Sequence, residues 1–412
     1  MKILVVSDRF PPWHSGGAAR VAGALASEYA GAGHEVVVAH GDPLAEPPHD
    51  GEIDGLEAHW VNAPVSTRLR GWRSVRNGRA LRQLARVVAA ERPDAAHAHN
   101  LHETFSFAAL DVLARARVPT VLTLHDCMSF HQGKLVEVAD RPAWETNDDA
   151  LVVTEWDLLR RYRFRYVPGR RRRIRCIIER SGARVVAVSR LLERVLRANR
   201  VPCHEVIHNG VRLDEFASTP EAIEALRSAL GLGGRRIVAT FGRLTREKGR
   251  VQIIAAVKRV RQLCPEAVLL AVGTPASALP GDAPFLVGTE RLAGAQLAAA
   301  YGLADAVVVP SVCLDVFPTV TLEAMAAGRP VVVSRFAGTS EIIEEGRTGF
   351  VVDALDVEDL AGRIRVLLQG AELAARVGAA GRELVKRRFT TARCASDYLG
   401  VFERLVGSSS AR

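Results

Sequence analysis

Short runs of valine, isoleucine and leucine alternate with longer helical patterns along the chain, and this alternation limits the possible folds more than any other feature. The runs are Lys2–Ser7, Glu35–Ala39, Ala95–Ala98, Val118–Leu124, Arg184–Ser189, Ile237–Phe241, Ala267–Val272, Ala306–Val309 and Val331–Ser334. Runs that are apolar on both faces are typical of parallel strands buried between two layers of helices. The segments between them, such as Arg250–Leu263, repeat apolar residues every three or four positions. The sequence therefore predicts an α/β protein with doubly wound parallel sheets.

The length of the chain indicates two such domains. A single hydrophobic core stops growing at roughly 250 to 300 residues, and this chain has 412. The periodicity breaks over Val201–Gly234, where glycines cluster. We predict a first domain over residues 1–205 that includes a C-terminal crossover helix over 388–412, and a second domain over 206–387. Because open α/β sheets bind ligands at the carboxyl ends of their strands, we expect the domains to face each other across a ligand-binding cleft.

Positive charge is concentrated in one segment. The composition, 48% hydrophobic and 25% charged, is that of a folded globular protein and excludes disordered and collagen-like chains. The net charge of +9 arises in the window Arg160–Arg175, which holds nine arginines and no acid, while the rest of the chain is balanced. This window is compatible with a solvated helix face, a nucleic-acid site, or a surface for an anionic membrane or acceptor. Nucleic acid ranks last, because no nucleic-acid-binding motif accompanies the segment.

The cysteines and the hydropathy pattern predict a cytoplasmic protein. The six cysteines lie far apart, form no CxxC pair and have no histidine at metal-ligand spacing, which favours buried thiols in a reducing compartment. No apolar stretch reaches the 18 or so residues that span a bilayer. We therefore expect a cytoplasmic protein that could still lie at the inner face of a membrane.

Polar residues in the first half cluster where strands are predicted to end. Gly16 and Gly17 follow the first strand at the start of a helical pattern, where backbone N–H groups can approach an anion. No GxGxxG motif follows this strand, so the dinucleotide-binding fingerprint is lacking. His99 and His102 follow the third strand and fit a core position or a ligand site equally well. His125 lies at a strand end beside Asp126, which favours a functional role.

The second half contains a pattern suited to a diphosphate. Arg243 and Lys248 lie on a turn between a predicted strand and a predicted helix. A guanidinium, an ammonium and a helix N-terminus together provide the donors that bind phosphate oxygens. A solvated turn is the alternative interpretation, and the next motif decides between the two.

That motif is Pro310–Pro330, a loop followed by a short helix. Its helix is predicted to begin near Pro318 and to end at Gly328. The backbone N–H groups of the first turn, at Thr319, Val320 and Thr321, can bind phosphate oxygens. The carboxylates of Asp315 and Glu323 can accept hydrogen bonds from the vicinal hydroxyls of a ribose or a hexose.

Several motifs in the same order resemble the retaining glycosyltransferases of family 4. They are VIHNGV, FGRLTREKG, an acid separated from Glu323 by seven residues, LEAMAAGRPVV and GTSEIIEEGRTG. The resemblance implies the GT-B fold of two Rossmann-like domains. It also implies transfer of a sugar from a nucleotide-diphosphate sugar with retention at the anomeric carbon, without a metal or any cofactor beyond the co-substrate. Among donors, UDP-sugars rank first and GDP-sugars next.

The resemblance also implies roles for individual residues. Arg243 and Lys248 would hold the donor diphosphate and stabilise the leaving group, and Glu323 would bind the ribose. The remaining donor-site residues would be Gly16, Gly17, Asp315, Thr319 and Val320, with His125 near the reacting carbon. The first domain would bind a glycan, glycolipid or small-molecule acceptor, with His99, His102, Arg163 and Arg170 as candidates.

Two departures from the family pattern leave alternatives open. Asp315 stands where the family usually has glutamate, which shortens the reach by roughly 1.5 Å; a misplacement of about 1 Å can cost on the order of 100-fold in rate. The segment Ala271–Pro275 replaces a turn that is often glycine-rich. The second departure leaves the base of the donor open. The alternatives to a transferase are a sugar-nucleotide epimerase and, because of Asp315, a non-catalytic sugar-nucleotide-binding protein.

Overall fold

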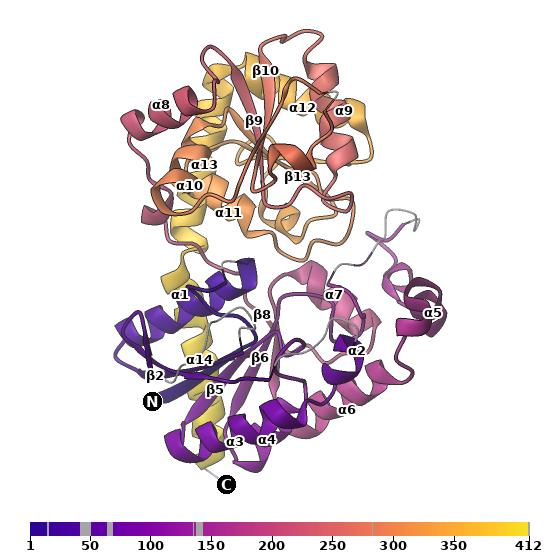
Figure 1. Cartoon of the computed structure of the whole chain (residues 1–412), viewed down its shortest axis with the longest axis vertical. Helices are drawn as coiled ribbons and strands as arrows, with labels where there is room; N and C mark the ends of the chain where they lie inside the picture. Colours follow the sequence, from indigo (N-terminus) through magenta and orange to yellow (C-terminus); the bar gives the residue numbers. More distant parts are fainter. Residues whose placement is uncertain are drawn as a thin grey trace. The chain divides into compact units, whose positions relative to one another are not determined.

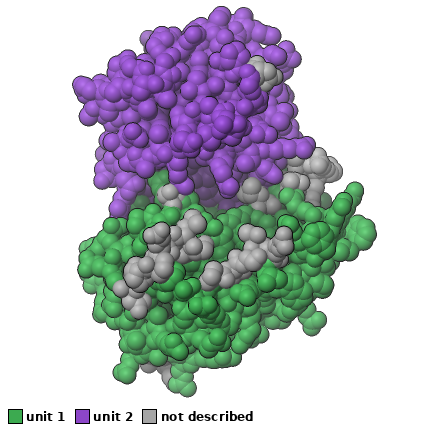
Figure 2. Space-filling view, in the orientation of Figure 1, with its two compact units in different colours: residues 1–136, 143–209, 391–412 green, residues 137–142, 210–390 purple. Residues whose placement is uncertain are grey.

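The protein is described by a computed structural model that covers residues 1–14, 16–41, 51–63, 69–134, 136, 143–281 and 283–410. The chain divides into two compact units, coloured separately in Figure 2. Unit 1 contains Met1–Val136, Ala143–Asn209 and Thr391–Arg412, and unit 2 contains Gly210–Thr390. All six cysteines are free thiols, of which Cys176 and Cys203 are half-buried and the other four buried. Across the described ranges, no helix is both long and apolar enough to span a membrane.

Unit 1 is built on an eight-stranded sheet with the strand order β3-β4-β2-β1-β5-β6-β7-β8. Its strands are β1 (Lys2–Ser7), β2 (Glu35–His40), β3 (Gly51–Ile53), β4 (Leu56–Trp60), β5 (Ala95–His99), β6 (Thr120–Leu124), β7 (Arg184–Ala187) and β8 (Glu205–Val206). Only the β3–β4 pair is antiparallel among these strands. The helices are α1 (Gly17–Gly31), α2 (Arg70–Arg73), α3 (Gly78–Glu91), α4 (Ala109–Arg115), α5 (Glu155–Tyr162), α6 (Arg170–Ser181), α7 (Arg190–Ala198) and α14 (Thr391–Ser410).

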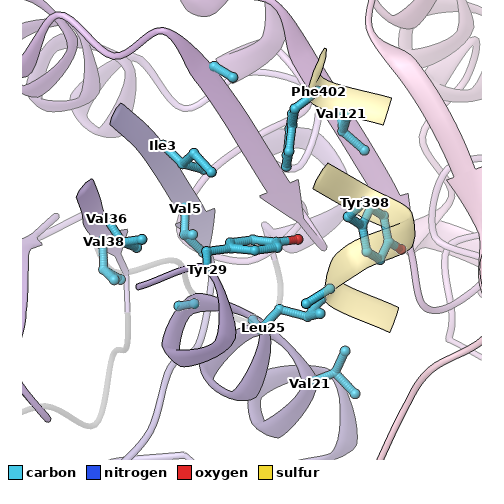
Figure 3. Packing of buried hydrophobic residues seen from close by; sticks show 14 of the residues in the cluster. Ile3, Val5, Val21, Leu25, Tyr29, Val36, Val38, Val121, Tyr398 and Phe402 are labelled. Carbon is cyan, nitrogen blue, oxygen red and sulfur yellow. The ribbon is translucent and has the colours of Figure 1, made fainter. Parts of the chain in front are cut away.

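The last helix of the chain completes the core of unit 1. Helix α14 packs against α1 and β6 (Figure 1). Its Tyr398 and Phe402 are buried beside Tyr29 of α1, and the rings of Tyr29 and Phe402 meet edge to face with centroids 5.9 Å apart (Figure 3). Burying a side chain of this size stabilises a fold by about 1.5–3 kcal/mol. The C-terminal segment is therefore an integral part of the first unit.

Unit 2 is built on a parallel six-stranded sheet with the order β11-β10-β9-β12-β13-β14. Its strands are β9 (Arg236–Phe241), β10 (Ala267–Val272), β11 (Leu286–Thr289), β12 (Ala306–Val309), β13 (Val331–Ser334) and β14 (Phe350–Val352). The helices are α8 (Pro220–Ala229), α9 (Arg250–Val260), α10 (Gly294–Leu303), α11 (Thr319–Ala326), α12 (Val357–Gln369) and α13 (Ala371–Arg388). Helices α9 and α12 pack together against the sheet and bury Ile253, Val257, Leu360 and Ile364.

The predicted α/β class with doubly wound sheets is confirmed. Each of the nine predicted strands is present, although several differ by a few residues at one end. Helix α9 ends at Val260, three residues before the predicted end, because the chain leaves the helix in a turn at Arg261. The strands that the sequence did not reveal are short, and most lie at or near a sheet edge.

Candidate functional site

Two loops at the carboxyl ends of β9 and β12 are packed backbone to backbone in unit 2. Gly249 has a φ of +77°, and a Cβ at this position would lie 1.8 Å from the carbonyl oxygen of Pro310. Only glycine allows the two loops to approach this closely. The N–H of Val312 also donates to the carbonyl of Glu247 at 3.0 Å. This packing brings Lys248 of the first loop to Asp315 of the second.

Lys248 and Asp315 form an ion pair. Lys248 Nζ lies 2.5 Å from Asp315 Oδ2, and Ser311 Oγ donates to the same oxygen at 2.9 Å. Asp315 is buried, and its backbone is fixed by bonds to Phe336 and Gly338, whereas the lysine side chain is 37% exposed. An ammonium carries three N–H donors, so this pairing orients Lys248 and leaves it capacity for an anion. Asp315, the shorter acid, thus contacts Lys248. A contact between Asp315 and the donor remains a prediction.

The turn that carries Arg243 is held by a neighbouring strand end. Thr274, just after β10, accepts from the N–H of Leu244 at 2.8 Å and donates to the carbonyl of Gly242 at 3.1 Å. Arg243 itself is exposed on this turn. The segment Ala271–Pro275, which differs from the family pattern, therefore has a structural role: its Thr274 holds the turn of Arg243. In the sequence, the position of Thr274 just after a predicted central strand was the signal that could have indicated this role.

The N-terminus of α11 follows the same loop. Pro318 precedes the helix and supplies no side-chain cap, and Thr319 and Val320 are its half-buried first residues. The N–H groups of a first helical turn lie at the positive end of the helix dipole, where they can bind phosphate. Thr321 differs from the prediction, because its N–H already donates to Pro318 at 3.2 Å and its hydroxyl bonds to Thr339 at 2.8 Å.

Glu323 lies one turn further along α11 and is buried. Its Oε2 accepts a hydrogen bond from the hydroxyl of Tyr301 at 2.6 Å. The Tyr301 ring stacks on Phe241 with centroids 3.7 Å apart and meets Phe216 edge to face. The carboxyl group is thus held in one orientation beside the strand end. Sequence reasoning missed Tyr301, whose helix is almost entirely apolar and carries no polar signal.

A second polar group lies at the strand ends of unit 1 and includes the predicted histidines. His99 is buried in β5, and its Nδ1 lies 3.0 Å from Nε2 of His125. Burial lowers the pKa of His125 to about 4 and the pKa of His99 well below its usual range. Both imidazoles are therefore neutral near pH 7. Behind them His97 bonds to Tyr29 and Thr123, as expected of a core histidine.

His102 belongs to a buried network of acids. Asp8, at the end of β1, accepts hydrogen bonds of 2.7 Å from the backbone N–H groups of His102, Glu103 and Phe105. Burial raises the pKa of Asp8 to about 6. The His102 ring bonds to Asp126 through Nε2 at 2.9 Å and to Arg70 through Nδ1 at 3.0 Å, so it links two strand ends to α2.

Cations surround Glu103 at the edge of this network. Arg9 pairs with one of its oxygens, Arg70 with the other at 3.0 Å, and Lys134 lies 3.5 Å away. Although burial opposes ionisation, the charges of Lys134, His102 and Arg70 lower the pKa of Glu103 to about 2. The sequence did not point to Arg9 or Arg70, because arginines that belong to no recognisable motif are usually solvated. Gly16, also in unit 1, precedes α1, which begins at Gly17 as predicted.

Only some arginines of the basic window Arg160–Arg175 are exposed. Arg170 is 2% exposed and donates to Ser74 Oγ, the His131 carbonyl and the Met128 carbonyl at 2.7–2.9 Å. Burial lowers its pKa to about 9. The expectation that Arg170 faces an acceptor or a membrane is wrong, because its guanidinium joins α6 to two loops inside unit 1. Arg163, in contrast, is exposed.

The fold and these strand-end loops define the class of the protein. Over 99% of both chains, the structure is similar to sucrose-phosphate synthase from Thermosynechococcus elongatus, with a TM-score of 0.74 and 20% identity. At this level of identity, the similarity establishes the fold. The protein therefore has the GT-B fold of glycosyltransferases.

Two family models identify it further. The model described as Glycosyltransferase Family 4 matches residues 15–215, and the model described as Glycosyl transferases group 1 matches residues 222–384. Between them the two models match most of the chain, one in each half. The chain belongs to the family 4 glycosyltransferases.

Curated relatives include two mannosyltransferases of Mycolicibacterium smegmatis. The GDP-mannose-dependent alpha-(1-6)-phosphatidylinositol monomannoside mannosyltransferase is 36% identical over 188 residues, which are 42% of this chain and 49% of that protein. The chain thus spans about half the length of this relative. The GDP-mannose-dependent alpha-mannosyltransferase is 27% identical over 415 residues, with full coverage of both proteins.

Proposed function

We propose that the protein is a retaining glycosyltransferase that uses GDP-mannose and acts on a glycolipid or glycan acceptor. The names of the two mannosyltransferases support this donor, and they reverse the order expected from the sequence, in which UDP-sugars ranked first. The name of the first relative supports a lipid-linked acceptor. Retention, independence from metals and the absence of a further cofactor are part of this proposal.

The observation that carries the proposal is the Lys248–Asp315 pair beside the N-terminus of α11. When the anomeric bond breaks, negative charge develops on the departing diphosphate. Preorganised cations and N–H groups at that position lower the barrier, and this kind of stabilisation is often the largest single contribution to catalysis. Lys248, Arg243 and the first N–H groups of α11 would supply it. Glu323, held by Tyr301, would bind the ribose hydroxyls.

The proposed step needs no covalent nucleophile. The acceptor oxygen forms a bond to the anomeric carbon on the face from which the diphosphate leaves. The bond between that carbon and the phosphate oxygen breaks, and a phosphate oxygen takes the acceptor proton. The glycosylated acceptor thus ends neutral at the new oxygen, and the nucleotide diphosphate leaves with the proton. The configuration at the anomeric carbon is kept. Roles for Gly16, Gly17 and His125 at the donor, and for His99, His102 and Arg163 at the acceptor, remain predictions.

Titration calorimetry with GDP, UDP and ADP, followed by turnover of GDP-mannose with and without glycolipid acceptors, tests the proposal. We expect GDP to bind most tightly and its release from GDP-mannose to require an acceptor. Lys248→Ala should cut turnover at least 100-fold, while Arg246→Ala, an exposed cation of the same turn, serves as the matched control. Donor consumption without acceptor would favour an epimerase, and nucleotide binding without turnover would favour a binding protein.

A further inference from the structure

Large apolar side chains are exposed together on one part of unit 1. Five of the ten such side chains in the described part of the chain lie on or beside α2, α5 and the 3-10 turn η2 (Arg163–Arg165). They are Leu69, Trp72, Trp156, Leu159 and Phe164. Trp156 is 68% exposed and Phe164 is 89% exposed. Contiguous exposed apolar groups of this kind mark interaction surfaces rather than ordinary protein surface.

Contacts between the elements place these side chains on adjoining parts of unit 1. The Arg173 guanidinium of α6 lies 5.5 Å from the centroid of the Trp72 ring. Gln132 bonds to the backbone of Arg165 and of Val167 at 2.9 Å, and Gly71 of α2 packs against Val167. Arg171 of α6 pairs with Glu155 of α5 at 3.5 Å. Figure 1 shows α2, α5 and α6 close together at one side of unit 1.

Helix α5 presents an apolar and basic stripe to solvent. Trp156, Leu159 and Arg160 are all exposed and follow the i, i+3, i+4 spacing of one helix face. Leu158, on the opposite face, is buried in unit 1. A capping box between Thr154 and Asp157 fixes where this helix begins. The exposed stripe is therefore set by the fold and does not arise from fraying.

Exposed arginines surround the apolar groups. They are Arg160, Arg163, Arg165, Arg172 and Arg173, which together with the five apolar residues form the arginine-aromatic surface. The acids nearby are engaged, since Glu155 bonds to Tyr166 and Arg171, and Asp157 belongs to the capping box. The surface therefore carries a local excess of positive charge.

We propose that the arginine-aromatic surface binds the face of an anionic lipid bilayer. Tryptophan and phenylalanine insert at the boundary between headgroups and acyl chains, and arginines pair with lipid phosphates. Binding strength scales with the buried apolar area plus the electrostatic attraction to anionic lipids, and this surface supplies both. Leu69 and Leu159 favour lipid over single-stranded nucleic acid, because a leucine offers no ring on which a base can stack. The inference goes beyond the proposed function and holds whether or not the donor is GDP-mannose.

Co-sedimentation of the full chain with vesicles tests this inference. Vesicles of phosphatidylcholine with phosphatidylglycerol should bind the wild-type protein, and pure phosphatidylcholine vesicles should bind it much more weakly. Each arginine near such a surface contributes roughly fivefold in affinity, so Arg160→Gln with Arg165→Gln should weaken binding about 25-fold at low salt. Trp156→Ser with Phe164→Ser should weaken it about tenfold or more.

Matched controls come from unit 2. Leu263→Ser removes an apolar side chain of similar exposure (61%), and Arg259→Gln removes an exposed cation, so both should bind vesicles like the wild type. GDP titration of every variant separates loss of the membrane surface from failure of the proposed donor site. Unchanged vesicle binding by both double variants would overturn the inference. Binding to a single-stranded oligonucleotide that the same variants abolish, without vesicle binding, would assign the surface to nucleic acid instead.

Discussion

The Tyr301→Phe variant tests how Glu323 is held. The substitution removes one hydroxyl, which donates to the buried Glu323 carboxyl group at 2.6 Å. The phenyl ring would keep its stacking on Phe241 and its edge contact with Phe216, so no cavity of any size is created. The change is therefore confined to one hydrogen bond and to the freedom of the carboxyl group.

The expected loss of stability follows from the chemistry of that bond. A hydrogen bond to a charged group contributes about 1.5–3 kcal/mol to the free energy of unfolding, and its loss takes one donor from a buried carboxyl group. For a domain of this size, each kcal/mol changes the melting temperature by roughly 2–4 °C. We expect the melting transition of unit 2 to fall by about 3–12 °C. GDP affinity should fall about tenfold, because Glu323 is no longer oriented toward the ribose.

Differential scanning calorimetry and GDP titration measure the two effects, and Tyr398→Phe is the matched control. Tyr398 is also buried and its hydroxyl accepts from Thr123 at 2.9 Å, but it lies in unit 1. Its loss should lower stability without changing GDP affinity. Wild-type melting and wild-type GDP binding by Tyr301→Phe would refute the assigned role of the Tyr301–Glu323 contact.

Three further predictions rest on other contacts. Asp315→Ala should lower the free energy of unfolding by only about 1 kcal/mol, because Lys248 is partly exposed. In a GDP-release assay the same variant should turn over the donor about tenfold more slowly. Unchanged turnover would show that Lys248 needs no partner. Arg170→Gln should lower the free energy of urea unfolding by about 3 kcal/mol or more, since three hydrogen bonds are lost inside unit 1. An unchanged free energy of unfolding would contradict the structural role of Arg170. Because burial raises the pKa of Asp8 from 3.8 to about 6, its folded-state carboxyl stays protonated while the unfolded one ionises, so the contribution of Asp8 to stability should decline by about 1–3 kcal/mol from pH 4 to 6. The lowered pKa values of the buried His99 and His125 act in the opposite direction, so the decline is measured as the difference in urea unfolding between the wild type and Asp8→Asn. A difference that does not change between pH 4 and 6 would contradict the protonated carboxyl group of Asp8.

The central strands were predictable because their residues are apolar on both faces. A strand such as β1 or β12 is buried between helices, so its whole sequence carries the signal. Strands β3 and β8 have only three and two residues, too few for any periodicity to be visible. They exist because a longer neighbouring strand offers hydrogen-bonding partners, which is tertiary information.

The loops of the candidate site were predictable for a different reason. Glycine, proline, lysine and acidic residues gather at strand ends, where the parallel topology brings them together. Partners that come from distant segments were not predictable, as Tyr301 beneath Glu323 and Arg170 among backbone carbonyls illustrate. A run of four arginines suggests a solvated face, and only packing shows that its first member is buried.

The most direct test of the proposed retaining transfer is proton NMR of the reaction product. GDP-α-mannose would be incubated with the full chain and a lipid-linked mannoside acceptor. The one-bond coupling between the new anomeric carbon and its proton would then be measured. The account predicts an α-linked product, formed together with one GDP per bond. A β-linked product would contradict retention. If GDP-, UDP- and ADP-sugars alike gave neither release of their nucleotide diphosphate nor a product, the assignment as a transferase would be contradicted.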